Sequence, residues 1–403
     1  MIAGCVYQAD PLGERSGSAA ACGRPRIVLT ATLPVRKTAS SLGNVVQRHL
    51  SALRRRYRTD LLLAPVTYSS VAVGAFATLP FNRNLMSWME AALYSPRVIL
   101  AQSRRAVRAL EQVSPRPGVI LQFHRMFSSV SAGEPGSAFC LFTDGSFHPD
   151  VGYPAWGPRC YREWYFRFQS ELYSRCNFVF TYSDWAREQI VTWHGIPEEQ
   201  VITVGAGANT DLPGKLSPIP RDAPRLLFVG TGFRVKGVDY LLRAFPLVRE
   251  KLPDAQLHLV GQPKDMRLPP TLPAGVEFHG PIYDRPTLDR MFEQSTALVL
   301  PSRWEMLGHV ILESFAFGRP VIASRMTAIP EWVEDGVTGF TVPSGDVDAL
   351  AARCFELLSD PAAAERMGRA GYQRVSKDGT WDSVVNKMSP YLERAALDGP
   401  VRG

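Results

Sequence analysis

The sequence contains few cysteines, six in 403 residues, and none of them forms a Cys-x-x-Cys pair or a Cys/His pattern with metal-ligand spacing. Neither a disulfide framework nor a structural zinc site is therefore expected in a chain of this length. Scattered single cysteines are typical of the reducing cytoplasm, which is the location we expect for this protein.

Long hydrophobic runs are also absent. No uncharged apolar stretch approaches the roughly 20 residues that a membrane-spanning helix needs, so no transmembrane segment is expected. Residues 1–24 contain acidic groups and lack both a basic start and a long apolar stretch. This composition predicts a disordered leader rather than a secretory signal.

Acidic residues are in the minority, with 38 Asp and Glu against 45 Lys and Arg and a net charge of +7. The excess lies in the first half of the chain, in Arg54, Arg55, Arg56, Arg58, Arg104, Arg105 and Arg108 among others. Such a surface attracts nucleic acid, an anionic membrane or an acidic substrate, although a solvated helix face is the favoured interpretation. No nucleic-acid-binding module is recognisable, so nucleic acid is not an expected partner, whereas peripheral contact with the inner face of an anionic membrane stays a candidate.

Short apolar runs alternate with helical patterns along the whole chain, in an ordinary globular composition with 45% hydrophobic and 21% charged residues. In the second half these runs predict buried strands at 225–230, 256–261, 276–280, 297–301, 320–324 and 337–343. Fainter runs in the first half predict strands at 26–30, 60–66, 97–103, 118–123, 138–143 and 177–183. The alternation predicts an α/β fold with parallel sheets, which bind ligands at the carboxyl ends of their strands.

The domain boundary is expected in the Pro/Gly-dense segment 212–220, which has α/β units on both sides. We therefore expect an N-terminal domain at 25–212 after the leader, a C-terminal domain at 213–380, and a C-terminal helix at 381–403 that packs back on the N-terminal domain. The predicted architecture is two Rossmann-like domains whose parallel sheets face a central ligand crevice.

The segment FVGTGFRVKG (228–237) is the first candidate for chemistry. A strand ends at Gly230, a turn containing Gly232 follows, and Arg234 and Lys236 precede the next helix. Two cations beside helix N–H groups at the ligand end of a strand suit a diphosphate. The spacing excludes a dinucleotide fingerprint and a Walker loop, and the alternative is a glycine turn with two solvated cations.

The segment PSRWEMLGHVILESFAFGRP (301–320) is the second candidate. The helix is expected to begin near Gly308, so Glu305 lies in the preceding loop and Glu313 in the second turn. Backbone N–H groups at that helix end suit a phosphate. Flanking carboxylates would bind hydroxyl donors such as those of a sugar and a ribose, whereas the alternative is an exposed Glu305 and a Glu313 in a buried helix pair.

Together these motifs resemble those of a known enzyme family. Residues from about 176 to 375 resemble the family-4 retaining glycosyltransferases, which have a two-domain fold of the GT-B type. The matching stretches are 176–209, 228–261 and 301–350, in the order and spacing that the family shows. The resemblance implies a nucleoside-diphosphate sugar donor bound mainly by the second domain and an acceptor bound mainly by the first.

The resemblance assigns the donor-site residues individually. Lys236 falls on the family's diphosphate-contacting lysine, Glu305 on the glutamate near the donor sugar, and Glu313 on the one that holds the ribose hydroxyls. Backbone N–H groups of residues 306–308 fall where the family meets the phosphate or the sugar. The further donor-binding positions are Gly230, Thr231, Gly232, Met306, Leu307 and Gly308.

One donor-site position departs from the family pattern. The family has an arginine directly after the glycine that ends the strand, and this chain has Thr231 there. We expect Arg234, two residues before Lys236, to supply the missing charge; the alternative is weak donor binding.

The match is thinner in the first domain. The family's His-Asp pair corresponds to Thr143 and Asp144, so the histidine is missing, and His148 or His124 is the expected substitute. Asp144 and His148 are therefore candidates for the catalytic centre, and His124 and Asp144 for the acceptor side. The acceptor loop at 30–44 has Gly43 as its only glycine, so the acceptor cannot be identified from the sequence.

The expected function is that of a retaining, metal-independent glycosyltransferase with no cofactor. It would move a sugar from a nucleoside-diphosphate sugar to a glycan, a lipid-linked acceptor or a small molecule. Arg234, Lys236 and Glu305 are the expected catalytic residues besides those of the first domain. The alternatives are a non-catalytic sugar-nucleotide or polysaccharide-binding protein, or a phosphorylase or epimerase on the same fold.

Overall fold

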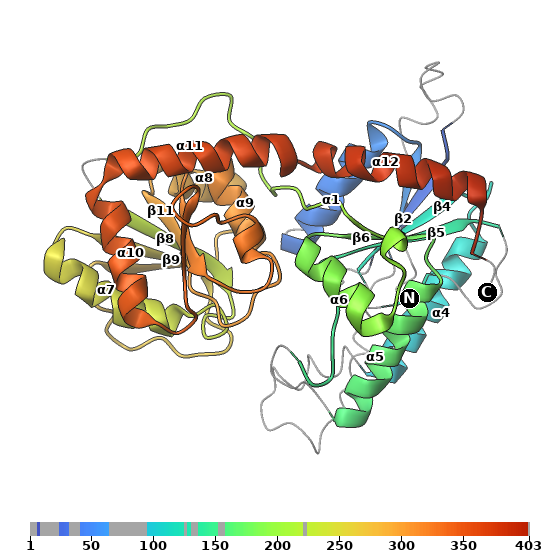
Figure 1. The fold of residues 1–403 in the computed structure, drawn as a ribbon, viewed down its shortest axis with the longest axis horizontal. Helices are drawn as coiled ribbons and strands as arrows, with labels where there is room; N and C mark the ends of the chain where they lie inside the picture. The colour runs from blue at the N-terminus through green and yellow to red at the C-terminus, as the bar shows by residue number, and fades with distance from the viewer. Residues whose placement is uncertain are drawn as a thin grey trace. The chain divides into compact units, whose positions relative to one another are not determined.

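The computed structural model describes residues 6–8, 24–31, 41–63, 95–124, 127–129, 136–151, 158–220 and 224–401. The chain divides into two compact units, one formed by Met1–Gly205 with Trp381–Gly403 and the other by Ala206–Thr380 (Figure 1). The division comes a few residues before the segment 212–220 where we expected it. That segment is part of the second unit.

The first unit is built on a seven-stranded sheet with the order β1-β3-β2-β4-β5-β6-β7. All neighbouring strands are parallel except β1, which pairs antiparallel with β3. The strands are β1 (Val6–Gln8), β2 (Ile27–Ala31), β3 (Thr59–Leu63), β4 (Val119–Phe123), β5 (Ala138–Thr143), β6 (Phe178–Thr181) and β7 (Val201–Thr203). Every residue of β2, β4 and β5 is buried, as expected for strands covered on both faces.

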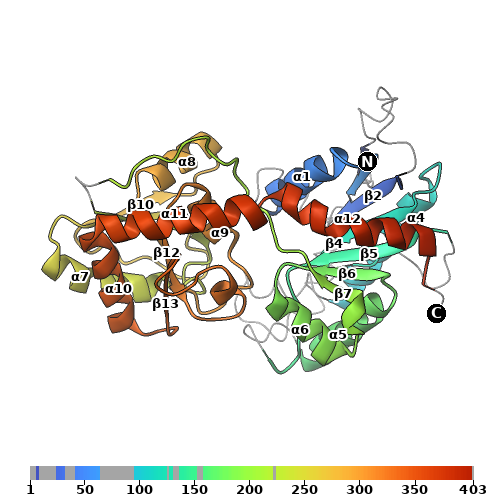
Figure 2. The same cartoon turned by 45° about the horizontal axis from the view of Figure 1, so that its top comes forward.

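Helices cover both faces of this sheet, with α5 and α6 on one side and α1 and α12 on the other (Figure 2). The helices are α1 (Ser41–Arg54), α4 (Pro96–Glu111), α5 (Arg159–Ser174), α6 (Asp184–His194), the short η2 (Glu198–Gln200) and α12 (Trp381–Asp398). The last helix reaches the first unit after the chain has left the second. Trp381 of α12 stacks on His49 of α1 at 5.3 Å between ring centroids, and Tyr391 packs against Phe178 of β6.

Two expectations for the first half are wrong. Residues 97–103 form part of helix α4, because their apolar run continues with buried residues at helical spacing, from Val98 and Ile99 to Gln102 and Ala106. The expected leader contains strand β1, whose β-branched and aromatic residues extend the sheet at the edge strand β3. The remaining leader residues, 1–5 and 9–23, lie outside the described part, as do residues 64–66 of the strand expected at 60–66.

The second unit is built on a six-stranded sheet with the order β10-β9-β8-β11-β12-β13, and all its described pairings are parallel. The strands are β8 (Arg225–Thr231), β9 (Gln256–Gln262), β10 (Val276–Gly280), β11 (Ala297–Leu300), β12 (Val321–Ser324) and β13 (Gly339–Val342). Helix α7 connects β8 to β9, and helix α9 connects β11 to β12, so these two connections run in opposite directions across the sheet. Right-handed crossovers therefore place these helices on opposite faces.

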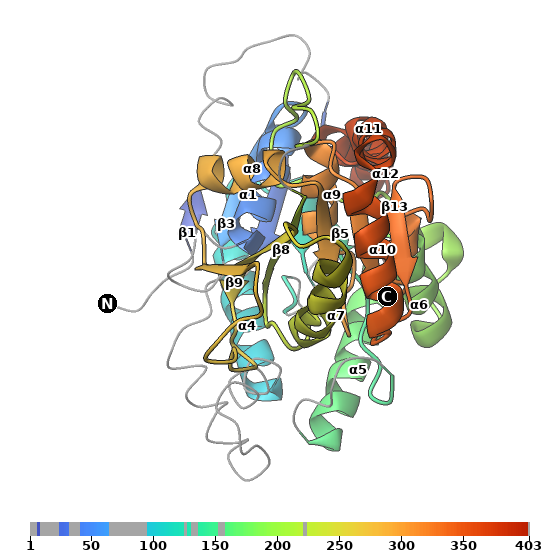
Figure 3. The same cartoon turned by 90° about the vertical axis from the view of Figure 1, so that its left-hand side faces the viewer.

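Helix α7 packs against α10 (Figure 3), and α9 packs against α11. The helices are α7 (Val238–Lys251), α8 (Arg285–Glu293), α9 (His309–Ala316), the short η3 (Ile329–Glu331), α10 (Val347–Ser359) and α11 (Pro361–Asp378). Asp346 caps α10 by accepting a hydrogen bond from the backbone N–H of Ala349 at 2.9 Å, as expected. Helix α7 continues through Pro246.

A buried arginine holds the start of the second unit. Arg319 is 1% exposed and donates hydrogen bonds to the carbonyls of Ser217, Pro218, Phe292 and Glu293. Burial lowers the pKa of Arg319 to about 10, so the side chain stays charged at neutral pH. The segment 217–218 is thereby tied to the end of helix α8. Among the helices in the described ranges, none combines the length and the apolar character needed to cross a membrane.

Candidate functional site

The β8–α7 loop forms one side of the candidate site, at the carboxyl end of β8. Gly237 has φ +73°, and a Cβ atom at this position would lie 1.9 Å from the carbonyl oxygen of Pro301. Only glycine therefore lets the loop approach the end of β11 so closely. Gly232 also has a positive φ, of +72°. Strand β8 continues to Thr231, one residue beyond Gly230, where we expected it to end.

Lys236 and Glu305 lie together across this approach. The Nζ atom of Lys236 is 2.5 Å from Oε2 of Glu305, and the two side chains are 21% and 14% exposed. Oε1 of the same carboxylate accepts the backbone N–H of Met306 at 3.2 Å. Both carboxylate oxygens are thus fixed in position, and the ammonium group is held beside the N-terminal end of α9.

The loop from Glu305 to Gly308 is held by the segment after β12. The hydroxyl of Thr327 donates to the carbonyl of Glu305, and the N–H of Ala328 donates to the carbonyl of Met306. Gly308 precedes α9 with φ +77°, and Leu307 is buried. The residues expected to present backbone N–H groups therefore lie at one helix end, next to the Lys236–Glu305 pair.

Glu313 lies on α9 and is 7% exposed. Its Oε2 atom is 2.9 Å from a guanidinium nitrogen of Arg285 on α8, which also pairs with Asp289. Burial lowers the pKa of Arg285, but Glu313 and Asp289 raise it more, for a net increase. The buried pairing that the sequence left open as an alternative is therefore present, with a partner from another helix.

Two further residues, Asp265 and Arg303, shape the β8–α7 loop. Asp265 accepts the backbone N–H groups of Arg234 and Val235 at 3.0 and 2.9 Å. Arg303 donates to the carbonyl of Arg234 and forms a two-pronged ion pair with Asp239, while its guanidinium lies 3.7 Å from the ring centroid of Tyr240.

These two residues do not stand out in the sequence because they come from separate segments. The proximity of Arg303 to Glu305 in sequence was the only available signal. Arg234 and Thr231 themselves are exposed.

In the first unit, His124 and Asp144 lie together at the carboxyl ends of the neighbouring strands β4 and β5. Nδ1 of His124 is 3.6 Å from Oδ1 of Asp144. His124 has φ +68°, a left-handed conformation that is uncommon outside glycine and concentrates at functional sites. Buried Thr143 donates its hydroxyl to the carbonyl of Gly145 at 3.0 Å.

His148 lies elsewhere in the same unit. Its ring packs against Phe166 and Trp193, at 5.3 and 5.2 Å between centroids, and its Nδ1 accepts the N–H of Asp150. Of the two substitutes expected for the missing histidine, His124 is therefore the one paired with Asp144. The acceptor loop at 30–44 lies largely outside the described residues.

One Asp-x-Asp triplet occurs in the chain, Asp346-Val347-Asp348. Such a triplet can bind the metal ion of a metal-dependent transferase, but here Asp346 caps helix α10. The carboxylate of Asp346 is thus engaged by the backbone of its own helix.

Solved structures share this fold over nearly the whole chain. A sucrose-phosphate synthase from Thermosynechococcus elongatus matches with a TM-score of 0.66 at 18% identity, over 93% of this chain and 100% of that one. HepE from Anabaena, solved with UDP-glucose, matches with a TM-score of 0.62 at 15% identity, over 92% and 100%. With two Rossmann-like units, these similarities define the fold as GT-B, as expected.

Residues 223–360, within the second unit, match the family model of the glycosyl transferases group 1. A glycogen synthase from Mycobacterium tuberculosis (strain ATCC 25618 / H37Rv) is 34% identical over 173 residues, 41% of this chain and 42% of the relative. A D-inositol 3-phosphate glycosyltransferase from Thermobifida fusca is 31% identical over 222 residues, 50% of this chain and 51% of the relative. The chain thus spans about half the length of the curated relatives it matches.

Proposed function

We propose that this protein is a retaining glycosyltransferase of family 4, which transfers a sugar from a nucleoside-diphosphate sugar to a glycan, a lipid-linked acceptor or a small molecule. The observation that carries the proposal is the Lys236–Glu305 pair beside the N-terminal end of α9. The relatives named as glycosyltransferases and the neighbour solved with UDP-glucose support it.

The donor would bind at the carboxyl ends of β8 and β11. The Lys236 ammonium has three N–H donors, so it can keep its bond to Glu305 and still donate to the diphosphate. Backbone N–H groups near Gly308 and the exposed guanidinium of Arg234 would add positive charge. Glu313, oriented by Arg285, would accept from the ribose hydroxyls through Oε1.

Positive groups at this place would accelerate transfer because they meet charge that grows in the transition state. As the bond between the donor sugar and the phosphate oxygen breaks, negative charge builds on the diphosphate. The acceptor hydroxyl would attack C1 from the same face, and its proton would pass to the departing phosphate oxygen. No metal ion or cofactor takes part in this scheme.

On the acceptor side, we assign His124 and Asp144 rather than His148. Asp144 lies close enough to orient the His124 ring, and the strained backbone of His124 holds that ring at the ligand end of β4. His124→Ala should lower turnover, whereas His148→Ala should act through stability. Equal turnover of the two folded variants would refute the assignment.

The direct test is release of nucleoside diphosphate from a panel of sugar nucleotides, with glycan, lipid-linked and small-molecule acceptors. Acceptor-dependent release that persists in EDTA is expected, and it should fall strongly in Lys236→Ala but not in Lys377→Ala. Lys377 is a matched control because it is an exposed lysine on α11. Activity that needs Mn²⁺ and disappears in EDTA would contradict the metal-independent scheme.

The non-catalytic alternative has specific support in Thr231 and Thr143. Thr231 stands where the family has an arginine, and the hydroxyl of Thr143 is engaged with Gly145 where the family has a histidine. On this alternative the protein binds sugar nucleotides but releases no nucleoside diphosphate with any acceptor. Binding and release measured on the same preparation separate the two functions.

We also propose that helix α4 contacts an anionic membrane surface. Arg97, Arg104 and Arg108 are exposed at spacings that place them on one face, together with Leu100, which is 43% exposed. Arg55, which directly follows α1, has a different partner, because it pairs with Asp382 of α12. Reversing the three α4 charges to Glu should abolish sedimentation with acidic vesicles; retained sedimentation would exclude this face.

A further inference from the structure

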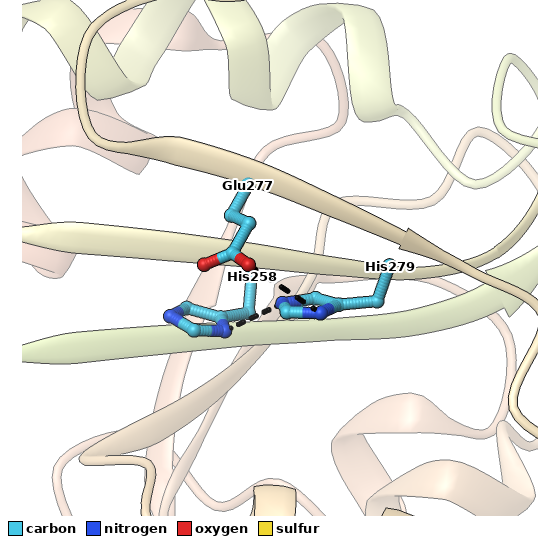
Figure 4. Close-up of side chains that lie close together, drawn as sticks. All are labelled: His258, Glu277 and His279. Atoms are coloured by element: carbon cyan, nitrogen blue, oxygen red, sulfur yellow. Dashed lines mark hydrogen bonds and ion pairs between the residues drawn. The ribbon is translucent and has the colours of Figure 1, made fainter.

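Three potential metal ligands lie together on strands β9 and β10, apart from the loops discussed above. Nδ1 of His258 is 2.8 Å from Nε2 of His279, and Nδ1 of His279 is 3.8 Å from Oε1 of Glu277. Figure 4 shows the three side chains directed toward one another. One ligand atom from each residue can be chosen so that all three lie within 4.8 Å of one another.

The sheet itself creates this cluster. His258 of β9 pairs in register with Glu277 of β10, so their side chains are neighbours across the two strands. Glu277 and His279 are two residues apart on one strand and therefore point to the same face. Because His258 is about 20 positions from the other two residues in sequence, no short ligand motif signals the cluster.

The chemistry of the three groups suits a divalent transition-metal ion. Two imidazole nitrogens and one carboxylate oxygen form a common ligand set for zinc, which leaves a fourth position for water.

The distances need only a small adjustment to bind an ion. Zinc binds nitrogen and oxygen at about 2.0–2.2 Å, so two ligands of one ion lie at most about 4.4 Å apart. The Glu277 side chain is 65% exposed and free to rotate inward, and His279 is 24% exposed. Arg225 is the nearby charge that opposes a cation, but its guanidinium is engaged with Gln256 and the carbonyl of Gln294.

We propose that His258, Glu277 and His279 bind one Zn²⁺-type divalent ion, which fastens the edge strand β10 to β9. β10 pairs only with β9 in the described sheet, so an ion held by both strands would add a cross-link at this edge. The loop between the two strands contains Asp265, which holds the β8–α7 loop. The ion cross-links the two strands and stands apart from the transfer chemistry, so the inference does not depend on the proposed function.

The test is Zn²⁺ binding to the metal-stripped full chain, measured by competition with a chromophoric chelator and by thermal unfolding. Wild type should take up one ion per chain and unfold a few degrees higher, because a ligand that binds only the folded state stabilises it. Mg²⁺ should have no such effect, since it prefers oxygen ligands. Absence of tight Zn²⁺ uptake by wild type would overturn the proposal.

Matched variants locate the ion. His258→Gln with His279→Gln should lose this uptake and the thermal shift, and Glu277→Gln should weaken binding by about ten-fold or more. Asp254→Asn removes an equal charge from an exposed position before β9 and should bind as wild type does. Glu277 is exposed, so Glu277→Gln reports on Zn²⁺ binding even if the double variant folds poorly. Zn²⁺ uptake at the wild-type level by Glu277→Gln and by the folded double variant would overturn the assignment.

Discussion

At the scale of single residues, Lys236 depends on its surroundings for its position. Glu305 pairs with its ammonium, and the glycine at 237 brings the lysine's loop against the end of β11. The position of the positive charge is therefore set before any ligand binds, and preorganised charge is what stabilises a transition state effectively.

Replacing Lys236 with Ala should reduce kcat by about 100-fold or more, the range seen when one preorganised donor to a developing anion is removed. Donor KM should change less, because other groups also bind the diphosphate. Steady-state kinetics on Lys236→Ala and on the control Lys377→Ala measure kcat and donor KM. A kcat close to wild type in the folded Lys236 variant would remove this residue from the mechanism.

Replacing Glu313 with Ala should instead raise donor KM by about ten-fold, since one hydrogen bond to a charged group is worth about 1.5–3 kcal/mol. Arg285 keeps Asp289 as a partner, so the variant should still fold. Isothermal titration with the nucleotide separates affinity from turnover. Unchanged affinity would mean that the Arg285 pair is the sole role of Glu313.

Gly237→Ala should destabilise the second unit. The added Cβ would collide with the carbonyl of Pro301 at 1.9 Å, and the positive φ adds strain of about 1 kcal/mol or more. Thermal unfolding should shift down by several degrees. Gly214→Ala is the matched control because a Cβ at that position meets nothing within 4 Å; equal unfolding temperatures of the two variants would contradict the close approach.

At the scale of elements, helix α12 is joined to the first unit through a buried histidine. His49 of α1 is fully buried between Phe142 and Trp381, and in the described structure its ring nitrogens have no hydrogen-bond partner. Burial lowers the pKa of His49 from its usual 6.5 to about 3. Protonation of this ring is therefore strongly disfavoured in the folded state.

This burial predicts acid sensitivity of the α1–α12 contact. Between pH 6.5 and 3 the unfolded state binds a proton that the folded state does not, so stability falls with falling pH, by about 2 kcal/mol at pH 5. His49→Leu should remove most of this loss. Hydrogen exchange of α12, compared between wild type and His49→Leu at each pH, measures this loss of stability. His258→Gln, in the other unit, is the control. If the pH dependence of exchange is unchanged in His49→Leu, the account is contradicted.

The sequence was sufficient to predict most strands of the second unit, because apolar runs ending in Gly or Pro leave little choice of structure. It failed at 97–103, where a short apolar run fits a strand and a helix equally and only the continuation to Ala106 decides. The motifs predict Lys236 and Glu305 as site residues, and the structure brings their side chains together. Their supports Asp265 and Arg303, and the Arg285 partner of Glu313, depend on tertiary pairing that local patterns do not contain.

At the scale of the whole molecule, the two units differ in their sequence similarity to a known protein family. The family match at 223–360 lies within the second unit, which also carries the proposed donor site. The first unit carries the excess of basic residues and the His124–Asp144 pair. Acceptor choice and any membrane contact are therefore expected to depend on the first unit.

The central claim, a nucleoside-diphosphate site in the second unit, is tested most directly by thermal unfolding with UDP, GDP, ADP, CMP and dTDP, alone and as sugar conjugates, without metal. A ligand at about 100 times its Kd stabilises by about 2.7 kcal/mol, which is enough for a shift of a few degrees. We predict that one nucleotide family shifts wild type and Lys377→Ala equally and shifts Glu313→Ala by less, because Glu313→Ala weakens donor binding. No shift with any of these ligands would contradict the account and identify Thr231 as a loss of donor binding.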